Sequence, residues 1–460
     1  MDTFVIDGGR RLSGRVRING SKNAALPLLA AALLTDQPVK LREVPNLADI
    51  RNMLKLLGEL GCPRLDEPAD GGFGDGTITV RVTDESLSHA RYEIVRTMRA
   101  SICALGPMLA RRGFARISLP GGCAIGERPV DLHLRGLAAL GAQITLSAGD
   151  IIAKVPPGGL VGTTVFMGGP FGSTVLGTAN VMSAATLAKG ATIIESAACE
   201  PEVVDLANLL NKMGAKISGH GSPRIVIEGV SELGGADHRV IPDRIEAGTY
   251  MMAAAVTNGE IILENCPVDS LLSAMHCLDT IGVHVEACNA VASNIPTRSA
   301  HRGCEDPMRC CVRVTSDRIL RPVEVTTQPH PGFPTDLQAQ LMTVLSLADG
   351  NSVITEKIFP DRFLHVAELT RMGAKIIRHG ATCVISGVRK LIGAPVMASD
   401  LRASAGLVLA GLAAEGRTTV SRVYHLDRGY ERMEDKLRAL GASIQRVDES
   451  EVAAAETVAG

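Results

Sequence analysis

Small and apolar residues gather in runs along the chain, and each run ends at a glycine or an aspartate that is followed by alternating apolar and polar residues. A run of this kind is typical of a buried helix, and alternation is typical of a half-buried strand. The residue between them breaks the helix, because it tolerates the left-handed backbone conformation. The breaks occur at Asp36, Gly113, Gly190, Gly259, Gly350 and Gly416.

A second series lies out of phase with the first. It consists of a leucine, two further residues, an apolar residue, a glycine and usually a small residue. Its glycines are Gly61, Gly141, Gly214, Gly282, Gly373 and Gly441, separated by 80, 73, 68, 91 and 68 residues. Helix-capping glycines that recur by chance are the alternative explanation. Two interleaved series favour instead a repeat of roughly 75 residues with two helices and several strands, an α/β composition.

Six repeats predict two domains of three repeats each. The polar segment Gly234–His238 marks the midpoint, and the first strand pair precedes the first full repeat. We therefore expect one domain at 22–241 and a second domain that combines 1–21 with 242–447. A hinged cleft between two such domains is a usual place for a ligand. The acidic, alanine-rich segment 448–460 is predicted to be a disordered tail.

The longest interval between repeats is about 20 residues longer than its neighbours. The excess is placed between Cys288 and Val312, a polar stretch that we expect to form a surface loop. His301 and three nearby cysteines could suggest a metal site, but they lack a paired C-x-x-C spacing, so we expect no metal. Eleven cysteines in a chain without a secretory signal fit a reducing cytoplasm, with most of them serving as small core residues.

Composition narrows the class of function. The net charge is −2, aromatic residues make up 3% and tryptophan is absent, which disfavours nucleic-acid binding. The N-terminal segment lacks a signal sequence, and the longest apolar run, 24–34, is too short to span a bilayer. We therefore expect a cytoplasmic protein with small-molecule partners, without membrane or nucleic-acid partners.

The segment LPGGCAIGERPVDLH, 119–133, carries the strongest local signal. Glycines flank Cys123, which predicts an accessible loop thiol. Pro129 suits the first position of a helix, which would place Arg128 at its positive end. Such a place binds anions and favours a thiolate. From these residues alone, an active-site thiol and a small loop cysteine remain alternatives.

Arginines recur beside small residues and turns in most of the repeats. Their planar guanidinium groups suit two-point binding of phosphate and carboxylate, whereas surface ion pairs are the alternative. The segments with candidate ligands are 20–27, 96–101, 242–246, 333–340, 361–363, 400–404 and 427–432.

Seven ordered segments carry a resemblance to a known family. They read GSKNAALP, PGGCAIGERPVDLHL, EPEVVD, PDRIEAGTY, FPTDLQAQ, DLRASAGLVLAG and YHLDRGYERMEDKLRALGA. From the first strand to about Val447, the chain resembles the UDP-N-acetylglucosamine 1-carboxyvinyltransferase family of enolpyruvyl transferases, whose architecture is shared with EPSP synthase. The resemblance implies two inside-out α/β barrel domains of three repeats each.

The same resemblance implies an activity. The enolpyruvyl group of phosphoenolpyruvate would pass to the 3′-hydroxyl of UDP-N-acetylglucosamine by addition and elimination, releasing phosphate. This reaction is the first committed step of peptidoglycan precursor synthesis. Phosphoenolpyruvate and UDP-N-acetylglucosamine are the expected partners, and no metal or redox cofactor is needed. Fosfomycin, an epoxide, would alkylate the accessible thiol of Cys123.

Residue roles also follow from the resemblance. Cys123 matches the proton donor to the C3 methylene, which also carries a covalent phosphoenolpyruvate-derived adduct, and Asp336 matches the general base. The implied ligands of phosphoenolpyruvate are Lys22, Asn23, Arg128, Arg402 and Arg428, of which Lys22 and Arg428 count as catalytic. The implied contacts to the sugar nucleotide are Arg99, Arg128, Pro129, Val130, Asp131, Leu132, Thr174, Val175, Asp336 and Ile358. The residues expected to support the closed site are Glu202, Asp243 and Arg362.

The chain departs from the family pattern on the uridine side. Gly172 stands where a lysine is common, Leu176 replaces a glycine, and Cys199 stands where arginine is frequent. These changes bear on nucleotide affinity. Two alternatives remain open: the sister activity on shikimate 3-phosphate, whose family lacks the cysteine-bearing loop, and a silent paralogue that binds a sugar nucleotide without turnover.

Overall fold

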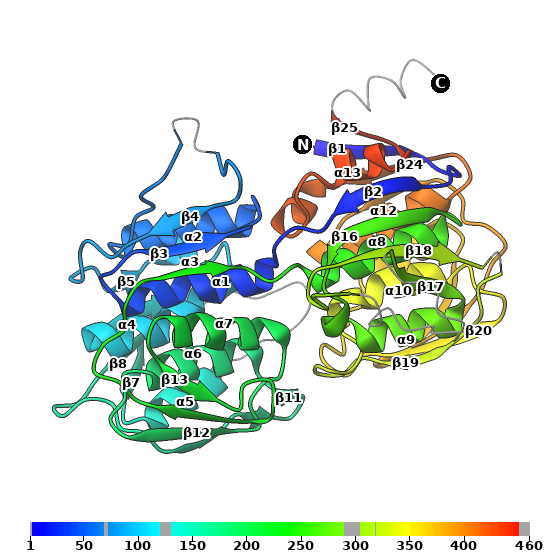
Figure 1. Ribbon diagram of the computed structural model, residues 1–460. Coiled ribbons are helices and arrows are strands. Elements are labelled where there is room, and N and C mark those ends of the chain that lie inside the picture. The colour runs from blue at the N-terminus through cyan, green and yellow to red at the C-terminus, as the bar shows by residue number, and fades with distance from the viewer. Residues whose placement is uncertain (1, 69–71, 120–129, 289–303, 318, 450–460) are drawn as a thin grey trace. The chain divides into compact units, whose positions relative to one another are not determined.

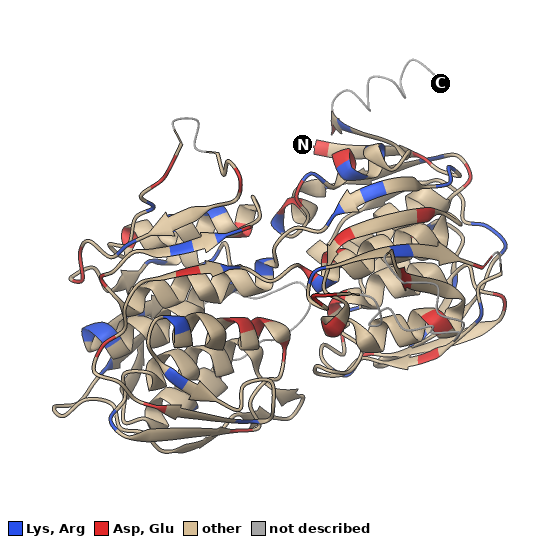
Figure 2. Cartoon of the chain, in the orientation of Figure 1, with Lys and Arg blue, Asp and Glu red and all other residues tan. Residues whose placement is uncertain are grey.

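The chain forms two compact units in the computed structural model, which describes residues 2–68, 72–119, 130–288, 304–317 and 319–449 (Figure 1). The N-terminal unit holds the described residues between Gly20 and Ile241, and the C-terminal unit holds those before Gly20 and from Pro242 onward. The chain therefore leaves the C-terminal unit after Asn19 and returns to it at Pro242. Acidic and basic side chains are interspersed along the elements of both units (Figure 2).

Three main sheets form the N-terminal unit, together with a two-stranded hairpin. The first sheet has the order β15 (Ala236–Arg239), β3 (Val39–Arg42), β4 (Ile78–Val80). The second has the order β5 (His89–Ala90), β6 (Phe114–Ser118), β8 (Asp150–Lys154), β7 (Gln143–Ser147). The third has the order β13 (Lys216–Ser218), β14 (Arg224–Glu228), β12 (Ala191–Glu195), β9 (Thr164–Phe166). The hairpin pairs β10 (Gly168–Gly169) with β11 (Gly172–Ser173).

Three four-stranded sheets form the C-terminal unit. The first has the order β17 (Val283–Ala287), β18 (Cys310–Ser316), β16 (Glu260–Cys266), β2 (Ser13–Arg17). The second has the order β19 (Glu324–Thr326), β20 (Asn351–Thr355), β22 (Thr382–Ser386), β21 (Lys375–His379). The third has the order β23 (Pro395–Met397), β24 (Arg417–Ser421), β1 (Asp2–Asp7), β25 (Ser443–Asp448). The first two strands of the chain thus pair with strands of its second half.

The six main sheets share one pairing pattern. In each sheet, the strand at one edge pairs in parallel with its neighbour, and the remaining neighbours are antiparallel. Many of their strands, such as β14, β12 and β20, bury alternate residues, whereas the edge strands β7 and β21 are mostly exposed. This alternation places one face of each sheet against a core and leaves the other face toward solvent.

Each unit also contains helices whose residues are buried almost throughout. In the N-terminal unit these are α1 (Lys22–Ala31), α4 (Leu105–Arg112) and α6 (Val175–Ala185). In the C-terminal unit they are α8 (Arg244–Val256), α10 (Gln338–Leu345) and α12 (Leu401–Ala413), which pack against one another. Their small residues permit this packing, since a Cβ atom on Gly406 would lie 2.9 Å from the carbonyl oxygen of Ala339. A helix that is apolar on all sides must be buried in this way.

A second set of helices has one buried face. The set comprises α2 (Ala48–Glu59), α5 (Asp131–Ala139), α7 (Pro201–Lys212), α9 (Leu272–Ile281), α11 (His365–Arg371) and α13 (Met433–Ala439). The short helical pieces are α3 (Tyr92–Val95), η1 (Ala32–Leu34), η2 (Arg99–Ala104), η3 (Val268–Ser270), η4 (Thr335–Leu337) and η5 (Val423–Arg428). No helix in the described part of the chain is long and apolar enough to cross a membrane.

The predicted helix breaks can be compared with the backbone angles. All six glycines of the second series have positive φ, from 73° at Gly61 to 105° at Gly214 and Gly282. In the first series, four glycines also have positive φ: Gly113, Gly190, Gly350 and Gly416. At Gly259 the predicted break falls between α8 and β16, but the preceding Asn258, with φ 47°, takes the left-handed conformation in its place. Asp36 likewise falls between η1 and β3, but the helical segment ends at an extended Thr35 and not at a left-handed residue.

Other local expectations need correction. The predicted polar break at 234–238 overlaps β15, which pairs in parallel with β3 inside the N-terminal unit and buries His238. The predicted loop at 288–312 ends earlier, since β18 begins at Cys310. Cys304 and Cys310 form a disulfide bond, in contrast to the expected reduced cysteines. Residues 450–460 of the predicted tail lie outside the described residues.

Candidate active site

Asp336 lies in the turn η4, which leads directly into the buried helix α10. Its Oδ1 accepts a hydrogen bond from Nη1 of Arg362 at 2.8 Å, and its Oδ2 accepts one from Nε of Arg402 at 3.3 Å. The arginine side chains are 6% and 2% exposed, whereas that of Asp336 is 25% exposed. A carboxylate held by one cation at each oxygen has a restricted orientation. Asp336 therefore offers a fixed carboxylate that remains partly accessible.

Arg402 belongs to the first turn of α12. The N-cap residue Asp400 accepts hydrogen bonds from the backbone N–H groups of Arg402 and Ala403, which fixes the start of this helix. The Nη1 and Nη2 atoms of Arg402 are buried and have no hydrogen-bond partner among the described residues. Burying such donors costs free energy unless an acceptor is bound. Two adjacent N–H donors suit a carboxylate or a phosphate group.

The surroundings of Arg402 keep its positive charge. Burial alone lowers the pKa of Arg402, but neighbouring Tyr430 and the carboxylates of Asp336 and Asp243 raise it above its usual value. The guanidinium carbon lies 5.3 Å from the centre of the Tyr430 ring, within range of a cation–π interaction. The phenolic oxygen of Tyr430 is 2.9 Å from Oγ1 of Thr249. These contacts hold a buried cation beside Asp336.

Glu356 organises the same region and carries no obvious signal in the sequence. Its Oε1 accepts hydrogen bonds from the backbone N–H groups of Ile358 and Phe359, at 2.8 and 2.9 Å. Its Oε2 accepts one from the Thr335 hydroxyl at 2.9 Å. The Thr335 oxygen in turn accepts one from Nη1 of Arg362 at 3.1 Å. The fully buried Glu356 thus connects the residue before Asp336 with the segment that contains Ile358.

In the N-terminal unit, Lys22 occupies the first position of α1. Ser21 caps this helix by accepting a hydrogen bond from the N–H of Ala24. The Nζ atom of Lys22 lies 3.3 Å from Oδ2 of Asp49, which belongs to the first turn of α2. Both side chains are almost entirely buried, whereas Asn23 is partly exposed. Asp49 was not predicted, because it looks like an ordinary acidic residue at the start of an amphipathic helix.

The predicted sugar-nucleotide residues of the N-terminal unit gather at helix starts. Thr174 caps α6, and its hydroxyl accepts a hydrogen bond from the N–H of Gly177. Leu132 lies beside the hairpin that precedes this cap, since a Cβ atom on Gly169 would lie 3.1 Å from its Cδ1 atom. Of these predicted contacts, Asp131 is exposed, and Val130, Leu132, Thr174 and Val175 are partly exposed.

Asn180 and His133 connect Arg99 to these helix starts. The Nδ2 atom of Asn180, on α6, donates to the carbonyl oxygen of Ile102 and lies 3.0 Å from Nδ1 of His133, on α5. Arg99 is the first residue of η2, the turn that contains Ile102. Burial and, to a lesser extent, the nearby Arg99 lower the pKa of His133 to about 4. His133 therefore accepts this hydrogen bond as a neutral ring.

The unusual segment around Gly172 has a conformational explanation. Gly172 lies in the β10–β11 hairpin with φ 100°, a backbone conformation that side chains other than glycine rarely adopt. A lysine at this position would be strained. The hairpin leads directly into the Thr174 cap of α6.

The predicted residues are divided between the two units. The C-terminal unit brings Asp336 together with Arg362 and Arg402. Its Arg428 is the last residue of η5, and there burial, together with the charge of Arg428, lowers the pKa of His425. Asp243 caps α8 through the N–H groups of residues 245 and 246. Ile358 also belongs to the C-terminal unit, and the remaining predicted residues that the structure describes belong to the N-terminal unit. Among them, Glu202 is buried in the first turn of α7.

The cysteine loop is not covered by the described residues. Cys123, Arg128 and Pro129 fall within 120–129, so their predicted roles stay predictions. Helix α5 begins at Asp131 with Val130 as its N-cap, two residues later than the predicted start at Pro129. Proline fixes its own φ and has no N–H group, so it is tolerated just before a helix as well as at its first position.

Comparison with known proteins identifies the family. Residues 6–437 match the family described as EPSP synthase (3-phosphoshikimate 1-carboxyvinyltransferase). The chain is 50% identical over 448 residues to UDP-N-acetylglucosamine 1-carboxyvinyltransferase of Methylacidiphilum infernorum, covering 97% of this chain and 99% of that one. It is 51% identical over 449 residues to UDP-N-acetylglucosamine 1-carboxyvinyltransferase 2 of Carboxydothermus hydrogenoformans, covering 98% of this chain and all of the relative.

Solved structures show the same architecture. The enolpyruvyl transferase NikO from Streptomyces tendae aligns with a TM-score of 0.81 at 25% identity, covering 97% of this chain and 99% of that chain. EPSP synthase from Acinetobacter baumannii aligns with a TM-score of 0.71 at 16% identity, covering 97% of this chain, and supports the fold alone. The chain therefore belongs to the enolpyruvyl transferase family, and its sequence groups with the UDP-N-acetylglucosamine 1-carboxyvinyltransferases.

Proposed function

We propose that the protein transfers the enolpyruvyl group of phosphoenolpyruvate to the 3′-hydroxyl of UDP-N-acetylglucosamine and releases phosphate. Identity of about half over nearly the full length with proteins of that name supports the substrates. The product would enter the synthesis of peptidoglycan precursors. This assignment requires no metal or redox cofactor.

The buried guanidinium of Arg402 is the observation that carries the proposal. Its two terminal nitrogens lack partners among the described residues, and the carboxylate of Asp336 is adjacent. Phosphoenolpyruvate carries a carboxylate and a phosphate, either of which can accept two hydrogen bonds from one guanidinium. We assign Lys22, Asn23, Arg128 and Arg428 to the same ligand, on the family resemblance.

The reaction needs an acid and a base. Cys123 is assigned as the acid that protonates C3 of phosphoenolpyruvate, which gives C2 positive character. Asp336 accepts the proton of the 3′-hydroxyl, whose oxygen then bonds to C2 and forms a tetrahedral ketal. Loss of a C3 proton and of phosphate restores the double bond and completes the transfer. Arg362 and Arg402 support the role of Asp336, because one cation at each oxygen fixes the orientation of the carboxylate that accepts the proton.

We further propose that the fold consists of two inside-out α/β barrel domains, 22–241 and 1–21 with 242–447, each of three repeats. The common pairing pattern of the six sheets and the three buried helices of each unit support this description. The remaining predicted contacts of the sugar nucleotide, and the supporting roles of Glu202 and Asp243, belong to the same proposal.

Phosphate release tests the assignment. The full-length protein is incubated with phosphoenolpyruvate and either UDP-N-acetylglucosamine or shikimate 3-phosphate as acceptor. We expect release only with the sugar nucleotide. Release only with shikimate 3-phosphate would assign the sister activity instead. Binding of UDP-N-acetylglucosamine by the folded protein without release would indicate a silent paralogue.

A further inference from the structure

Two cysteines outside the proposed active site face each other across neighbouring strands. The antiparallel ladder of β17 and β18 runs from Val283 opposite Ser316 to Ala287 opposite Val312. The next pair in this register is Cys288 and Cys311, and the backbone N–H of Cys288 donates to the carbonyl oxygen of Cys311 at 2.9 Å. Residues directly opposite in such a ladder have adjacent side chains on the same face. The register therefore places the two thiols together.

The sulfur atoms are already close. The Sγ atoms of Cys288 and Cys311 are 2.9 Å apart. A disulfide bond is about 2.05 Å long, so the atoms must approach by less than about 1 Å to form one. Cross-strand cysteines also meet the general requirement that Cα atoms lie within about 7 Å. The bond can therefore form without a change in strand register.

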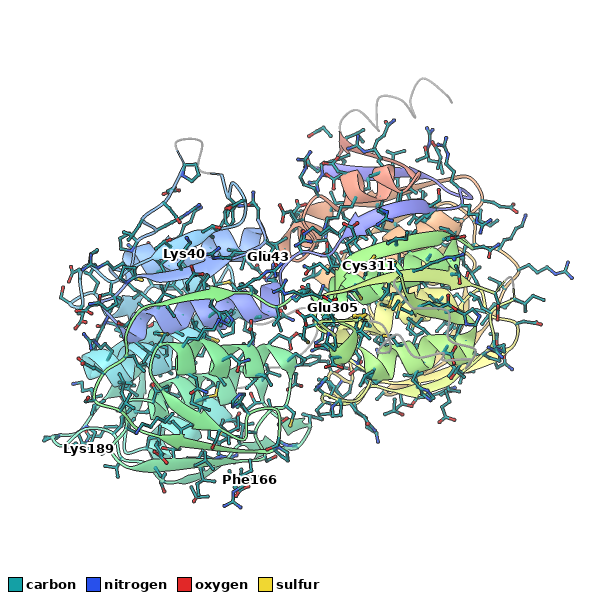
Figure 3. All side chains as sticks on the ribbon, in the orientation of Figure 1. Lys40, Glu43, Phe166, Lys189, Glu305 and Cys311 are labelled. Atoms are coloured by element: carbon teal, nitrogen blue, oxygen red, sulfur yellow. A yellow bond between two sulfur atoms is a disulfide. The ribbon has the colours of Figure 1, made fainter. Side chains whose placement is uncertain are left out.

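Exposure distinguishes this pair from the other free thiols described in the C-terminal unit. Cys288 is exposed and Cys311 is partly exposed (Cys311 is labelled in Figure 3). By contrast, Cys266 and Cys277 are buried, and burial raises the pKa of Cys277 to about 12. Cys310 is also buried and already bonded to Cys304. Alternation along β18 directs Cys310 inward and Cys311 outward, so the exposed pair is separate from the existing disulfide.

Metal binding explains the pair less well than disulfide formation. Groups of three or more side chains able to hold a metal ion do not occur in the described part of the chain. Burial and the Cys311 contact raise the pKa of Cys288 to about 11, and Arg15 and Arg313 offset only part of this rise. The short distance between the two sulfur atoms therefore favours disulfide formation, and the two arginines disfavour a cationic metal.

We propose that Cys288 and Cys311 form a reactive dithiol that small-molecule disulfides, such as glutathione disulfide, oxidise to a second disulfide bond. One cysteine thiolate attacks a sulfur of glutathione disulfide, forms a mixed disulfide and releases one glutathione thiol. The second cysteine then attacks the protein sulfur of that mixed disulfide and releases the second glutathione. The two cysteines lose two electrons and two protons, and glutathione disulfide gains them. The product closes a ring that runs from residue 288 to residue 311.

Mass spectrometry of the full-length protein tests the proposal. The folded protein is incubated with glutathione disulfide, its free thiols are blocked with N-ethylmaleimide, and its peptides are mapped without reduction. We expect a peptide pair linked through Cys288 and Cys311, which is converted to two alkylated thiols after reduction. Complete alkylation of both cysteines in the treated protein would overturn the proposal. A link from Cys288 to Cys304 or Cys310 would overturn it as well.

Two variants separate the pair from general thiol reactivity. In Cys288→Ser, the exchange can proceed only to its first stage, so Cys311 should carry one glutathione and no internal link. Cys277→Ser, which removes a buried thiol, should leave the Cys288–Cys311 link unchanged. Both variants should keep phosphate release, because neither residue belongs to the proposed active site. Loss of the link in Cys277→Ser would show that the pairing assigned from the register is wrong.

Discussion

Asp336 is paired with Arg362 and Arg402, so its substitution should affect both turnover and stability. Because the carboxylate is the proposed base, Asp336→Asn should lower kcat by about 10²- to 10⁴-fold. Binding of UDP-N-acetylglucosamine, measured by titration calorimetry, should change much less. Asp336→Ala should show the same separation, at an added cost in stability because two buried cations lose their partner. Both variants are compared with the wild type at saturating substrate.

A neighbouring aspartate supplies the control for Asp336. The side chain of Asp361 is 83% exposed and pairs with Arg378, so Asp361→Asn removes the same charge from the surface. This variant should keep nearly full turnover. Equal losses in the two variants, or full turnover in Asp336→Asn, would remove Asp336 from the role of base.

Binding of phosphoenolpyruvate should depend on the planar shape of the Arg402 guanidinium as well as on its charge. Lysine keeps the charge but cannot make two parallel hydrogen bonds to one anion. Arg402→Lys should therefore raise KM for phosphoenolpyruvate by about tenfold or more, with a smaller effect on KM for the sugar nucleotide. Steady-state kinetics with each substrate varied in turn measures both values. An unchanged KM for phosphoenolpyruvate would contradict the assignment of Arg402 to that ligand.

Individual residues differed in how far the sequence could predict them. Asp336 and Arg402 stand in segments specific enough to be recognised, and the structure brings them together. Glu356 and Asp49 stand in ordinary strand and helix contexts, and their side-chain partners Thr335 and Lys22 are 21 and 27 residues away in sequence. Such contacts arise only when the fold is known. The cysteine loop remains a sequence prediction, since its residues are outside those described.

At the scale of elements, Glu356 connects the end of β20 to the turn that carries Asp336. Its oxygens accept four hydrogen bonds, from Thr327, Thr335 and the N–H groups of residues 358 and 359. Glutamine replaces one acceptor with an N–H₂ donor, so at least one of these contacts must be lost. Glu356→Gln should lower kcat/KM by about tenfold to a hundredfold through displacement of the site. It should also lower the free energy of unfolding by about 1–3 kcal/mol.

The matched control is Glu324→Gln, which changes an exposed residue of β19 in the same sheet. Its kinetics and its unfolding in urea should match those of the wild type. If Glu356→Gln loses stability without any change in kcat or KM, then Glu356 supports the sheet and does not position Asp336.

Two glycines, one with a left-handed backbone and one inside a helix, provide a second test of the elements. Gly172→Ala places a Cβ atom at φ 100° and should destabilise the protein by about 1–2 kcal/mol. Gly58 lies on the exposed side of α2, and a Cβ atom there would have nothing within 4 Å. Gly58→Ala should therefore stabilise the protein by about 0.5–1 kcal/mol. Urea unfolding followed by circular dichroism measures both, and a stabilising Gly172→Ala would contradict the hairpin geometry.

The elements show why helix ends were easier to predict than strand limits. A helix that ends at a left-handed glycine carries the signal in one residue, as at Gly61 and Gly441. Strand β15 has only two residues on each face, and its polar composition resembles a linker. Its parallel pairing with β3, nearly 200 residues earlier, determines that it is a strand. Local sequence contains no record of such a partner.

For the whole molecule, one buried histidine in each unit should couple stability to pH. Burial lowers the pKa of His133, in the N-terminal unit, to about 4 and that of His365, in the C-terminal unit, also to about 4. Arg99 and Arg362 respectively add to this lowering, while Asp131 and Asp400 oppose it. In the unfolded chain both rings titrate near 6.5. Both units should therefore respond in the same range of pH.

The direction of the effect follows from proton binding. Between pH 6.5 and 4 the unfolded chain binds protons that the folded histidines do not, so the free energy of unfolding rises with pH in this window. The contribution of each histidine to the free energy of unfolding is therefore present at pH 7 and is lost as the pH falls toward 4. The upper limit is on the order of 3 kcal/mol for each histidine. Hydrogen exchange of peptides from α5 and α11 is measured at pH 7 and pH 5 and corrected for the slower intrinsic exchange at pH 5. The resulting protection factors should be lower at pH 5 in both helices.

Substitution separates these histidines from general acid destabilisation. In His133→Gln the amide oxygen can still accept the hydrogen bond from Asn180, but the residue no longer titrates. The pH dependence of exchange should therefore weaken in α5 and persist in α11. His379→Gln, at an exposed position of β21, should leave both dependences unchanged. If α5 keeps its full pH dependence in His133→Gln, the acid sensitivity of the N-terminal unit must come from other groups, such as carboxylates whose ion pairs are lost on protonation.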